Sequence, residues 1–215
     1  MHERADFMKR IVILILLIVF SNIVSAQKYI FFLHNSFIEM AGAEAVHPEY
    51  GKAEYNEIIK AFKEAGFNVI SEVRAKNTDV KEYAKKTVKQ MDSLIHKGVK
   101  PGDITVIGTS KGGQIAMYVS GYLKNKDANF VFIGCCGEEG SDAKPEINFC
   151  GNVLSIREKS DVGIGSCLQL KDKSVNKVGH FKEIELNTGL KHGFLFKALP
   201  DWIRPCVAWA NGNYN

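Results

Sequence analysis

Short apolar runs alternate with segments of helical hydrophobic spacing through most of this chain, and this alternation strongly constrains its fold. The apolar runs predict strands at residues 28–34, 68–73, 104–107, 130–133, 152–156 and 183–186. The other segments predict helices at 53–65, 79–97, 112–123 and 194–210, the last interrupted by Pro200 and Pro205. This order is typical of βαβ units. We therefore expect an α/β fold with a mainly parallel sheet of about six strands and helices on both faces.

The composition is that of an ordinary globular protein. The chain has 215 residues, of which 46% are hydrophobic, enough to bury one core. Its net charge is +4, and the charges alternate in sign, so the pattern favours a solvated surface over nucleic-acid binding. Because no linker, repeat or low-complexity tract is visible, residues 27–215 are predicted to form a single domain.

The first 26 residues have the pattern of a signal peptide. Lys9 and Arg10 precede the apolar run IVILILLIVFSNIV, and the small residues of the segment VSA end at Ala26. An uncleaved anchor is the alternative, but the run is shorter than the ~18–20 residues that span a bilayer. We expect cleavage after residue 26, export to the periplasm or beyond the cell, and no stable membrane anchor afterwards. Translation could start at Met1 or at Met8.

The motif with the clearest chemistry is GTSKG at residues 108–112. It follows the apolar run ITVI and opens a predicted helix, which is the strand–turn–helix context of a nucleophilic serine. Glycines at both sides of Ser110 allow a turn so tight that larger side chains would clash. The helix amino terminus behind Ser110 favours negative charge. The alternative is an ordinary turn in which Ser110 caps the helix.

A serine nucleophile needs a base and an orienting carboxylate. Among the histidines, His192 follows the last predicted strand and so falls at the same edge of the sheet as Ser110. Asp161 lies past the strand at 152–156, while Glu158 is closer to that strand and could take its place. The chain order Ser110, Asp161, His192 matches the order expected for such a triad.

The negatively charged intermediate of acyl transfer needs two hydrogen-bond donors. The backbone N–H of Lys111 is one candidate, and the loop after the first strand would supply the second from Asn35 or Ser36. His34 could brace that loop or be an ordinary buried histidine, and a substrate contact is also open to it. Arg74, just past the second strand, could bind a substrate anion or pair with a neighbouring carboxylate.

These residues resemble the α/β-hydrolase superfamily over nearly all of residues 28–210. The segments LHNS, GTSKGG and KHGF, with Asp161, carry the resemblance. It implies a serine hydrolase that cleaves an ester or thioester of a small molecule through an acyl-enzyme, without metal or cofactor. A binding protein that keeps the fold without catalysis and an acyltransferase with the same triad are the alternatives. Family members usually have His-Gly where this chain has His34 and Asn35.

Two further expectations concern loops and cysteines. The interval 134–151 is too short for a helical cap domain, so the site should be open, and the irregular loop 37–51 could form one of its walls or be an ordinary surface loop. The fold places the cysteines at opposite sheet edges, which allows the disulfide pairs Cys136–Cys167 and Cys150–Cys206. The odd number of cysteines leaves at least one thiol free or paired outside the chain.

Overall fold

The computed structural model describes residues 27–137 and 147–215. The predicted signal peptide, residues 1–26, lies outside the described residues, so cleavage and export stay predictions. Within the two described stretches, no helix combines the length and the apolar character needed to cross a membrane.

Six parallel strands form the central sheet, in the order β4-β1-β5-β6-β7-β8. Along the chain they are β1 (Tyr29–Leu33), β4 (Asn68–Ile70), β5 (Ile104–Thr109), β6 (Asn129–Ile133), β7 (Gly151–Glu158) and β8 (Val178–Leu186). The strand order reverses direction at β1, as in doubly wound sheets. The predicted α/β fold is confirmed.

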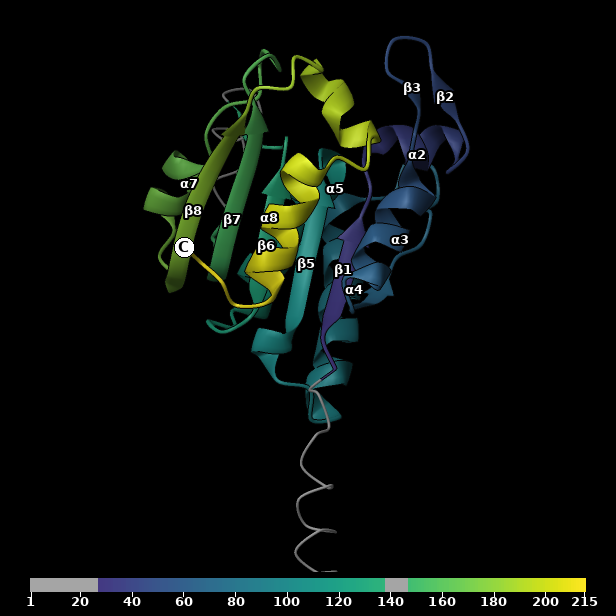
Figure 1. Ribbon diagram of the computed structural model, residues 1–215. Helices are drawn as coiled ribbons and strands as arrows, with labels where there is room; N and C mark the ends of the chain where they lie inside the picture. Colours follow the sequence, from purple (N-terminus) through teal and green to yellow (C-terminus); the bar gives the residue numbers. More distant parts are fainter. Residues whose placement is uncertain (1–26, 138–146) are drawn as a thin grey trace, which may run out of the picture.

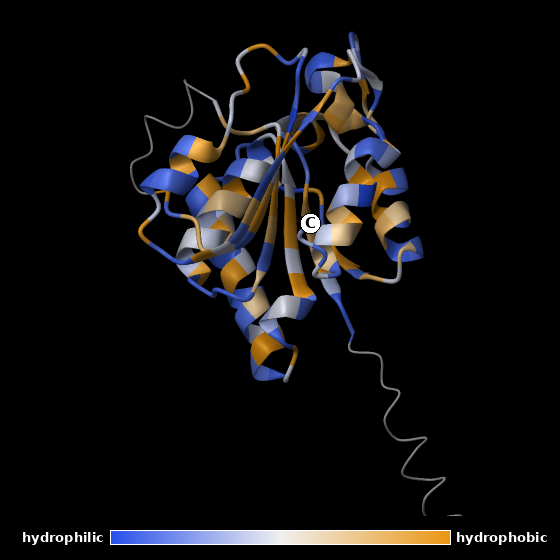
Figure 2. Ribbon diagram, turned by 60° about the vertical axis from the view of Figure 1, so that its left-hand side comes forward, coloured by the Kyte–Doolittle hydropathy of each residue, from blue (hydrophilic) through white to orange (hydrophobic). Residues whose placement is uncertain are grey.

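Helices cover both faces of the sheet (Figures 1 and 2). One layer contains α3 (Tyr55–Glu64) and α8 (Pro200–Ala210), and the other contains α4 (Val80–His96), α5 (Lys111–Leu123) and α7 (Leu168–Lys173). In β1, Ile30 and Phe32 pack into the first layer, whereas Phe31 and Leu33 pack into the second. Because successive side chains of a strand point to opposite faces, a continuous apolar run is what a strand buried on both faces requires.

The segment 36–51, expected to be a loop, contains regular structure. A short helix α2 (Ser36–Ala41) begins because the side-chain oxygen of Asn35 accepts a hydrogen bond from the N–H of Ile38. A small antiparallel hairpin follows, with β2 (Val46–His47) paired to β3 (Gly51–Lys52). In Figure 1, this hairpin and α2 lie at the end of the sheet opposite the start of β1.

Two other expectations were wrong in detail. The single helix predicted at 194–210 is divided into a 3₁₀ helix η2 (Lys191–Phe196) and α8, because Pro200 occupies the first turn of α8, where its missing N–H costs nothing. The hydrophobic pattern predicted neither α7 nor the first five residues of β8. A further 3₁₀ turn, η1 (Pro101–Asp103), precedes β5.

Candidate active site

Ser110 occupies a strained turn between β5 and α5. Its φ is +50° and its ψ −118°, a region that non-glycine residues rarely adopt. The turn brings the helix against the sheet so closely that a Cβ at Gly108 would lie 2.1 Å from the Gly112 carbonyl oxygen. A Cβ at Gly112 would lie 1.9 Å from the carbonyl oxygen of Leu33. Both glycines of the motif are therefore required by backbone contact, and the strain at Ser110 is of the kind that is stored at functional sites.

Ser110, His192 and Asp161 form a continuous hydrogen-bonded chain. The Nε2 atom of His192 lies 3.0 Å from the hydroxyl oxygen of Ser110, and its Nδ1 atom lies 2.6 Å from Oδ2 of Asp161. Since a carboxylate can only accept, Nδ1 donates to Asp161, and Nε2 is left to accept the hydroxyl proton of Ser110. The structure thus brings together the three residues that the sequence selected. Asp161 is buried, while His192 keeps 29% of its side chain exposed.

The acid and the base come from loops that follow neighbouring strands. Asp161 follows β7 and His192 follows β8, and the two loops are joined by Glu158, the last residue of β7. Glu158 accepts hydrogen bonds from Ser160, Thr188 and Gly189, and it has no bond to His192. The alternative in which Glu158 replaces Asp161 is therefore wrong in this structure.

Three candidate donors for an oxyanion lie beside Ser110. Lys111 is the first residue of α5, so its backbone N–H has no acceptor within the helix. Asn35 and Ser36 line the same pocket as Ser110. The side-chain nitrogen of Asn35 is buried and has no hydrogen-bond partner among the described residues.

His34 and Arg74 do not line this pocket. Both are buried, and the Nε2 atom of His34 accepts the backbone N–H of Arg74 at 3.0 Å, while Nδ1 of His34 lies 2.8 Å from the carbonyl oxygen of Asn35. Arg74 donates to the carbonyl oxygen of His34 at 2.6 Å and to Glu39 at 3.0 Å. The structure therefore favours the interpretation in which His34 braces the loop and Arg74 pairs with a carboxylate. It gives no support to a substrate contact by either.

Glu39 links this buried cluster to the nucleophile. Its Oε2 atom accepts from Arg74, and its Oε1 atom lies 2.5 Å from Nζ of Lys111. Burial disfavours the charged form of Glu39, but hydrogen bonds from Lys111 and Arg74 outweigh it and hold the pKa of Glu39 below its usual value. Burial and the charge of Arg74 lower the pKa of His34 to about 4. Glu39 was not among the predicted site residues, because its position carries no local motif.

The pocket around Ser110 has a volume of about 320 Å³. Besides Ser110 and His192, its wall is built from α2, the hairpin and the end of η2, and the side chains that form it are Asn35, Ser36, Phe37, Met40, His47, Tyr50 and Phe196. The expectation that segment 37–51 forms one wall agrees with this lining. The contribution of Phe196 was missed, although the residue stands only four positions after His192.

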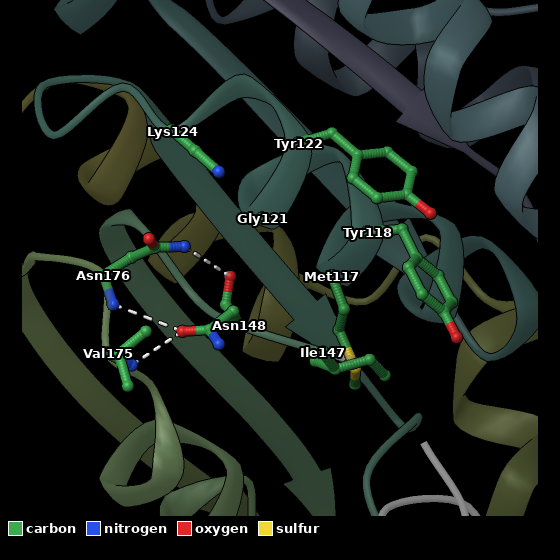
Figure 3. A pocket seen from close by; sticks show the side chains of 9 residues that line it. All are labelled: Met117, Tyr118, Gly121, Tyr122, Lys124, Ile147, Asn148, Val175 and Asn176. Atoms are coloured by element: carbon green, nitrogen blue, oxygen red, sulfur yellow. Dashed lines mark hydrogen bonds between the residues drawn. The ribbon is translucent and has the colours of Figure 1, made fainter. Parts of the chain in front are cut away.

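A hollow of about 280 Å³ lies at the far end of α5 from Ser110 (Figure 3). Its polar centre is Asn148, whose side-chain oxygen accepts from the backbone N–H groups of Val175 and Asn176. These bonds hold two loops together, so Asn148 has a structural role there. Among the described residues, no group of three or more His, Cys, Asp or Glu side chains is arranged to hold a metal.

One of the two predicted disulfides is confirmed. Cys136 and Cys167 are bonded, with their Cα atoms 5.3 Å apart. The pair Cys150–Cys206 was wrong, because neither residue is in a disulfide; both are buried thiols, as is Cys135. The Sγ atom of Cys135 instead packs against Gly113 of α5. The disulfide ties the loop after β6 to the segment that follows Asp161.

Solved structures resemble this one along most of the chain. The structure of SOBER1 from Arabidopsis thaliana matches 88% of this chain and 100% of its own, with 14% identity and a TM-score of 0.58. An α/β serine hydrolase without a lid from Xanthomonas campestris matches 90% and 85%, with 10% identity and a TM-score of 0.57. A dienelactone hydrolase from Anabaena variabilis matches 89% of each chain, with 15% identity and a TM-score of 0.55. The chain has the α/β-hydrolase fold.

In the α/β-hydrolase fold, a nucleophile sits on the turn after a central strand, which is the place of Ser110 here. No family model and no curated protein sequence matches the chain. The predicted lack of a cap concerns residues 134–151, of which 138–146 lie outside the described part; a lidless hydrolase is nevertheless among the similar structures.

Proposed function

We propose that the protein is a serine hydrolase that cleaves an ester or thioester of a small molecule through an acyl-enzyme. The observation that carries the proposal is the unbroken chain from Ser110 through His192 to Asp161 on the wall of an open pocket. A non-catalytic binding protein would gain nothing from a strained serine aligned with a buried His–Asp pair.

The reaction follows from the hydrogen bonds. Ser110 attacks the carbonyl carbon of the ester while its proton moves to Nε2 of His192, and Asp161 stabilises the imidazolium that forms. Collapse of the tetrahedral intermediate breaks the bond to the alcohol or thiol, which takes the proton from Nε2. A water molecule then attacks the acyl-enzyme, again giving its proton to His192, and the acid leaves as Ser110 regains its proton.

Negative charge on the carbonyl oxygen would be met by the backbone N–H of Lys111 and by a donor of Asn35 or Ser36. The unpaired side-chain nitrogen of Asn35 supports a role for this residue, because a buried donor without a partner is costly unless a ligand uses it. Asn35 would then act at the position where members of the α/β-hydrolase superfamily usually carry glycine.

The test is labelling of the purified protein, residues 27–215, with a fluorophosphonate probe, which reacts only with an activated serine. We expect labelling of the wild type and none of Ser110→Ala or His192→Ala. The matched controls are Ser93→Ala and His96→Ala on the exposed side of α4, which should label like the wild type. A folded wild-type protein that does not label would overturn the proposal.

We also propose that the enzyme works outside the cytoplasm. The signal-peptide pattern of residues 1–26 supports this second part of the proposal. Expression of the full chain followed by amino-terminal sequencing of the periplasmic fraction tests it. We expect the mature protein to begin at Gln27.

A further inference from the structure

Four aromatic rings gather on one side of the Ser110 pocket. The ring of His47 stacks on Tyr50 with centroids 4.5 Å apart, and both meet the ring of Phe196, at 5.5 and 5.3 Å. Phe37 closes the group, 5.1 Å from His47 and 5.2 Å from Phe196. We call these four residues the aromatic wall; all of them line the pocket that holds Ser110 and His192.

The aromatic wall is rigidly connected to the triad. The Nδ1 atom of His47 accepts the backbone N–H groups of Glu49 and Tyr50, which fixes the ring in the hairpin and leaves its proton on Nε2. Tyr50 packs on Gly193, the neighbour of His192, so closely that a Cβ there would lie 2.7 Å from the Tyr50 ring. The wall therefore holds a set position beside the base.

Charged side chains lie outside this pocket. No Lys, Arg, Asp or Glu is among the residues that line it. A hollow on the other side of Tyr50 is lined by charged groups that are already paired. There Lys191 pairs with Glu49 at 3.2 Å, and Lys197 pairs with Glu54, outside that lining, at 3.2 Å. A charged substituent next to the aromatic wall would lose water without gaining a partner, which is unfavourable.

We propose that the aromatic wall binds an uncharged aromatic or alkyl substituent of the ester. This inference rests on the proposed function, since it assumes that the ester carbonyl is held at Ser110. Burial of apolar surface against rings favours such a substituent, and Met40 at the pocket mouth, 46% exposed, adds a flexible apolar contact. A wall of rings can also attract a quaternary ammonium group through its π-faces. A comparison of a charged with an uncharged substituent therefore tests the proposal.

A pair of esters of equal shape separates the two chemistries. Acetylcholine and 3,3-dimethylbutyl acetate differ only in a charged nitrogen against a neutral carbon. We expect the neutral ester to be hydrolysed with at least tenfold higher kcat/KM, and a preference for acetylcholine would overturn the proposal. Two further series, 4-nitrophenyl esters of growing acyl length and acetates of growing alcohols, identify which substituent meets the wall.

Variants of the wall test its residues. Phe37→Ala should lower kcat/KM for hexanoyl or benzyl esters by about tenfold or more and change it less than about threefold for short esters. Phe37→Leu should restore much of the loss. Met40→Glu should reduce the preference for neutral esters. The control is Val175→Glu, which places the same charge on an exposed residue just before β8, and it should leave the preference unchanged. Equal losses for short and long esters would indicate general damage and contradict the proposal.

Binding to an inactive protein separates this inference from the proposed function. Ser110→Ala should bind the intact hexanoyl or benzyl ester in a calorimetric titration, and the double variant Ser110→Ala/Phe37→Ala should bind it at least tenfold more weakly. If the wild type fails to label with the probe yet this difference holds, the hydrolase proposal fails and the pocket assignment stands. Equal binding by both variants would overturn the pocket assignment even in an active enzyme.

Discussion

The carboxylate of Glu158 accepts two hydrogen bonds from Thr188, one from its backbone N–H at 2.9 Å and one from its hydroxyl at 2.8 Å. Its other oxygen accepts from Ser160 and Gly189. Glu158 therefore ties the loop that carries Asp161 to the loop that carries His192. Burial raises the pKa of Glu158, but these donors outweigh it and lower the pKa to about 2. The charged side chain of Glu158 positions the acid and the base without a side-chain bond to either, while its backbone carbonyl accepts the N–H of Asp161 at 3.0 Å.

Glu158→Gln should therefore impair both stability and catalysis. A glutamine keeps one acceptor oxygen, but its NH₂ group would face the donors that now bond to the second carboxylate oxygen. The free energy of unfolding should therefore fall by about 1–3 kcal/mol. We expect kcat to fall more than KM rises, as the triad loosens. Because the folded pKa is lowered, the stability difference from wild type should shrink as the pH falls from about 4.5 towards 2. Glu185→Gln, at an exposed ion pair with Arg157, is the control, and equal effects of the two substitutions would contradict this role.

Asp161→Asn should leave the fold intact and lower kcat by up to about four orders of magnitude. An asparagine can donate to Nδ1 of His192, which places the ring proton on Nε2, where it faces Ser110 instead of accepting from it. Ester hydrolysis and the rate of probe labelling measure the loss. Asp172→Asn, on the exposed end of α7, should behave as wild type. Full activity of Asp161→Asn would remove Asp161 from the triad.

His34 should make the fold sensitive to mild acid. Its pKa is lowered to about 4 in the folded protein, against 6.5 as the ordinary value, because it is buried beside Arg74. The unfolded chain therefore binds more protons in this range, and the free energy of unfolding should fall, on the order of 3 kcal/mol, as the pH drops from about 6.5 to 4. Urea titrations across this range measure it. His34→Gln should flatten the slope while His96→Gln keeps it, and parallel slopes for all three proteins would exclude His34 as the cause.

Glu39→Gln should destabilise the protein by about 3–5 kcal/mol, because it leaves the guanidinium of Arg74 buried beside a neutral partner. Glu82→Gln removes an exposed ion pair with Lys85 and should cost less than about 1 kcal/mol. Chemical denaturation of both variants provides the comparison. If the two losses are similar, the Glu39–Arg74 pair does not hold the loop as described.

Removal of the disulfide by Cys136→Ala/Cys167→Ala should lower the free energy of unfolding by about 3–4 kcal/mol, since the bond closes a loop with a sequence separation of 31. Non-reducing peptide mapping of the wild type should recover these two cysteines linked, with Cys135, Cys150 and Cys206 alkylated because they are outside any disulfide. A linked Cys150–Cys206 peptide would contradict the structure.

The sequence by itself determined the layers of the fold and the three residues of the hydrogen-bonded chain. Strands buried on both faces leave continuous apolar runs, and helices leave a hydrophobic period of three to four residues; both signals are local and can be seen without a structure. The motif around Ser110 is local in sequence too, because its residues are consecutive, although the contact of Gly112 with Leu33 comes from β1. Asp161 and His192 could be selected because residues that follow parallel strands meet at one edge. Segment 36–51 was harder to predict, because a six-residue helix and a hairpin with strands of two residues each are too short to leave a hydrophobic period.

Only the tertiary structure decided which side chains meet at the end of the sheet where the parallel strands finish. Glu39 reaches Lys111 over 72 positions, and Glu158 reaches Thr188 over 30. The same holds for the meeting of Phe37 with Phe196. No local pattern records these pairs, because each depends on the order of the strands in the sheet and on the path of the loops between them. Burial then selects among the partners, since a charge or ring removed from water is stable only beside a group that compensates it.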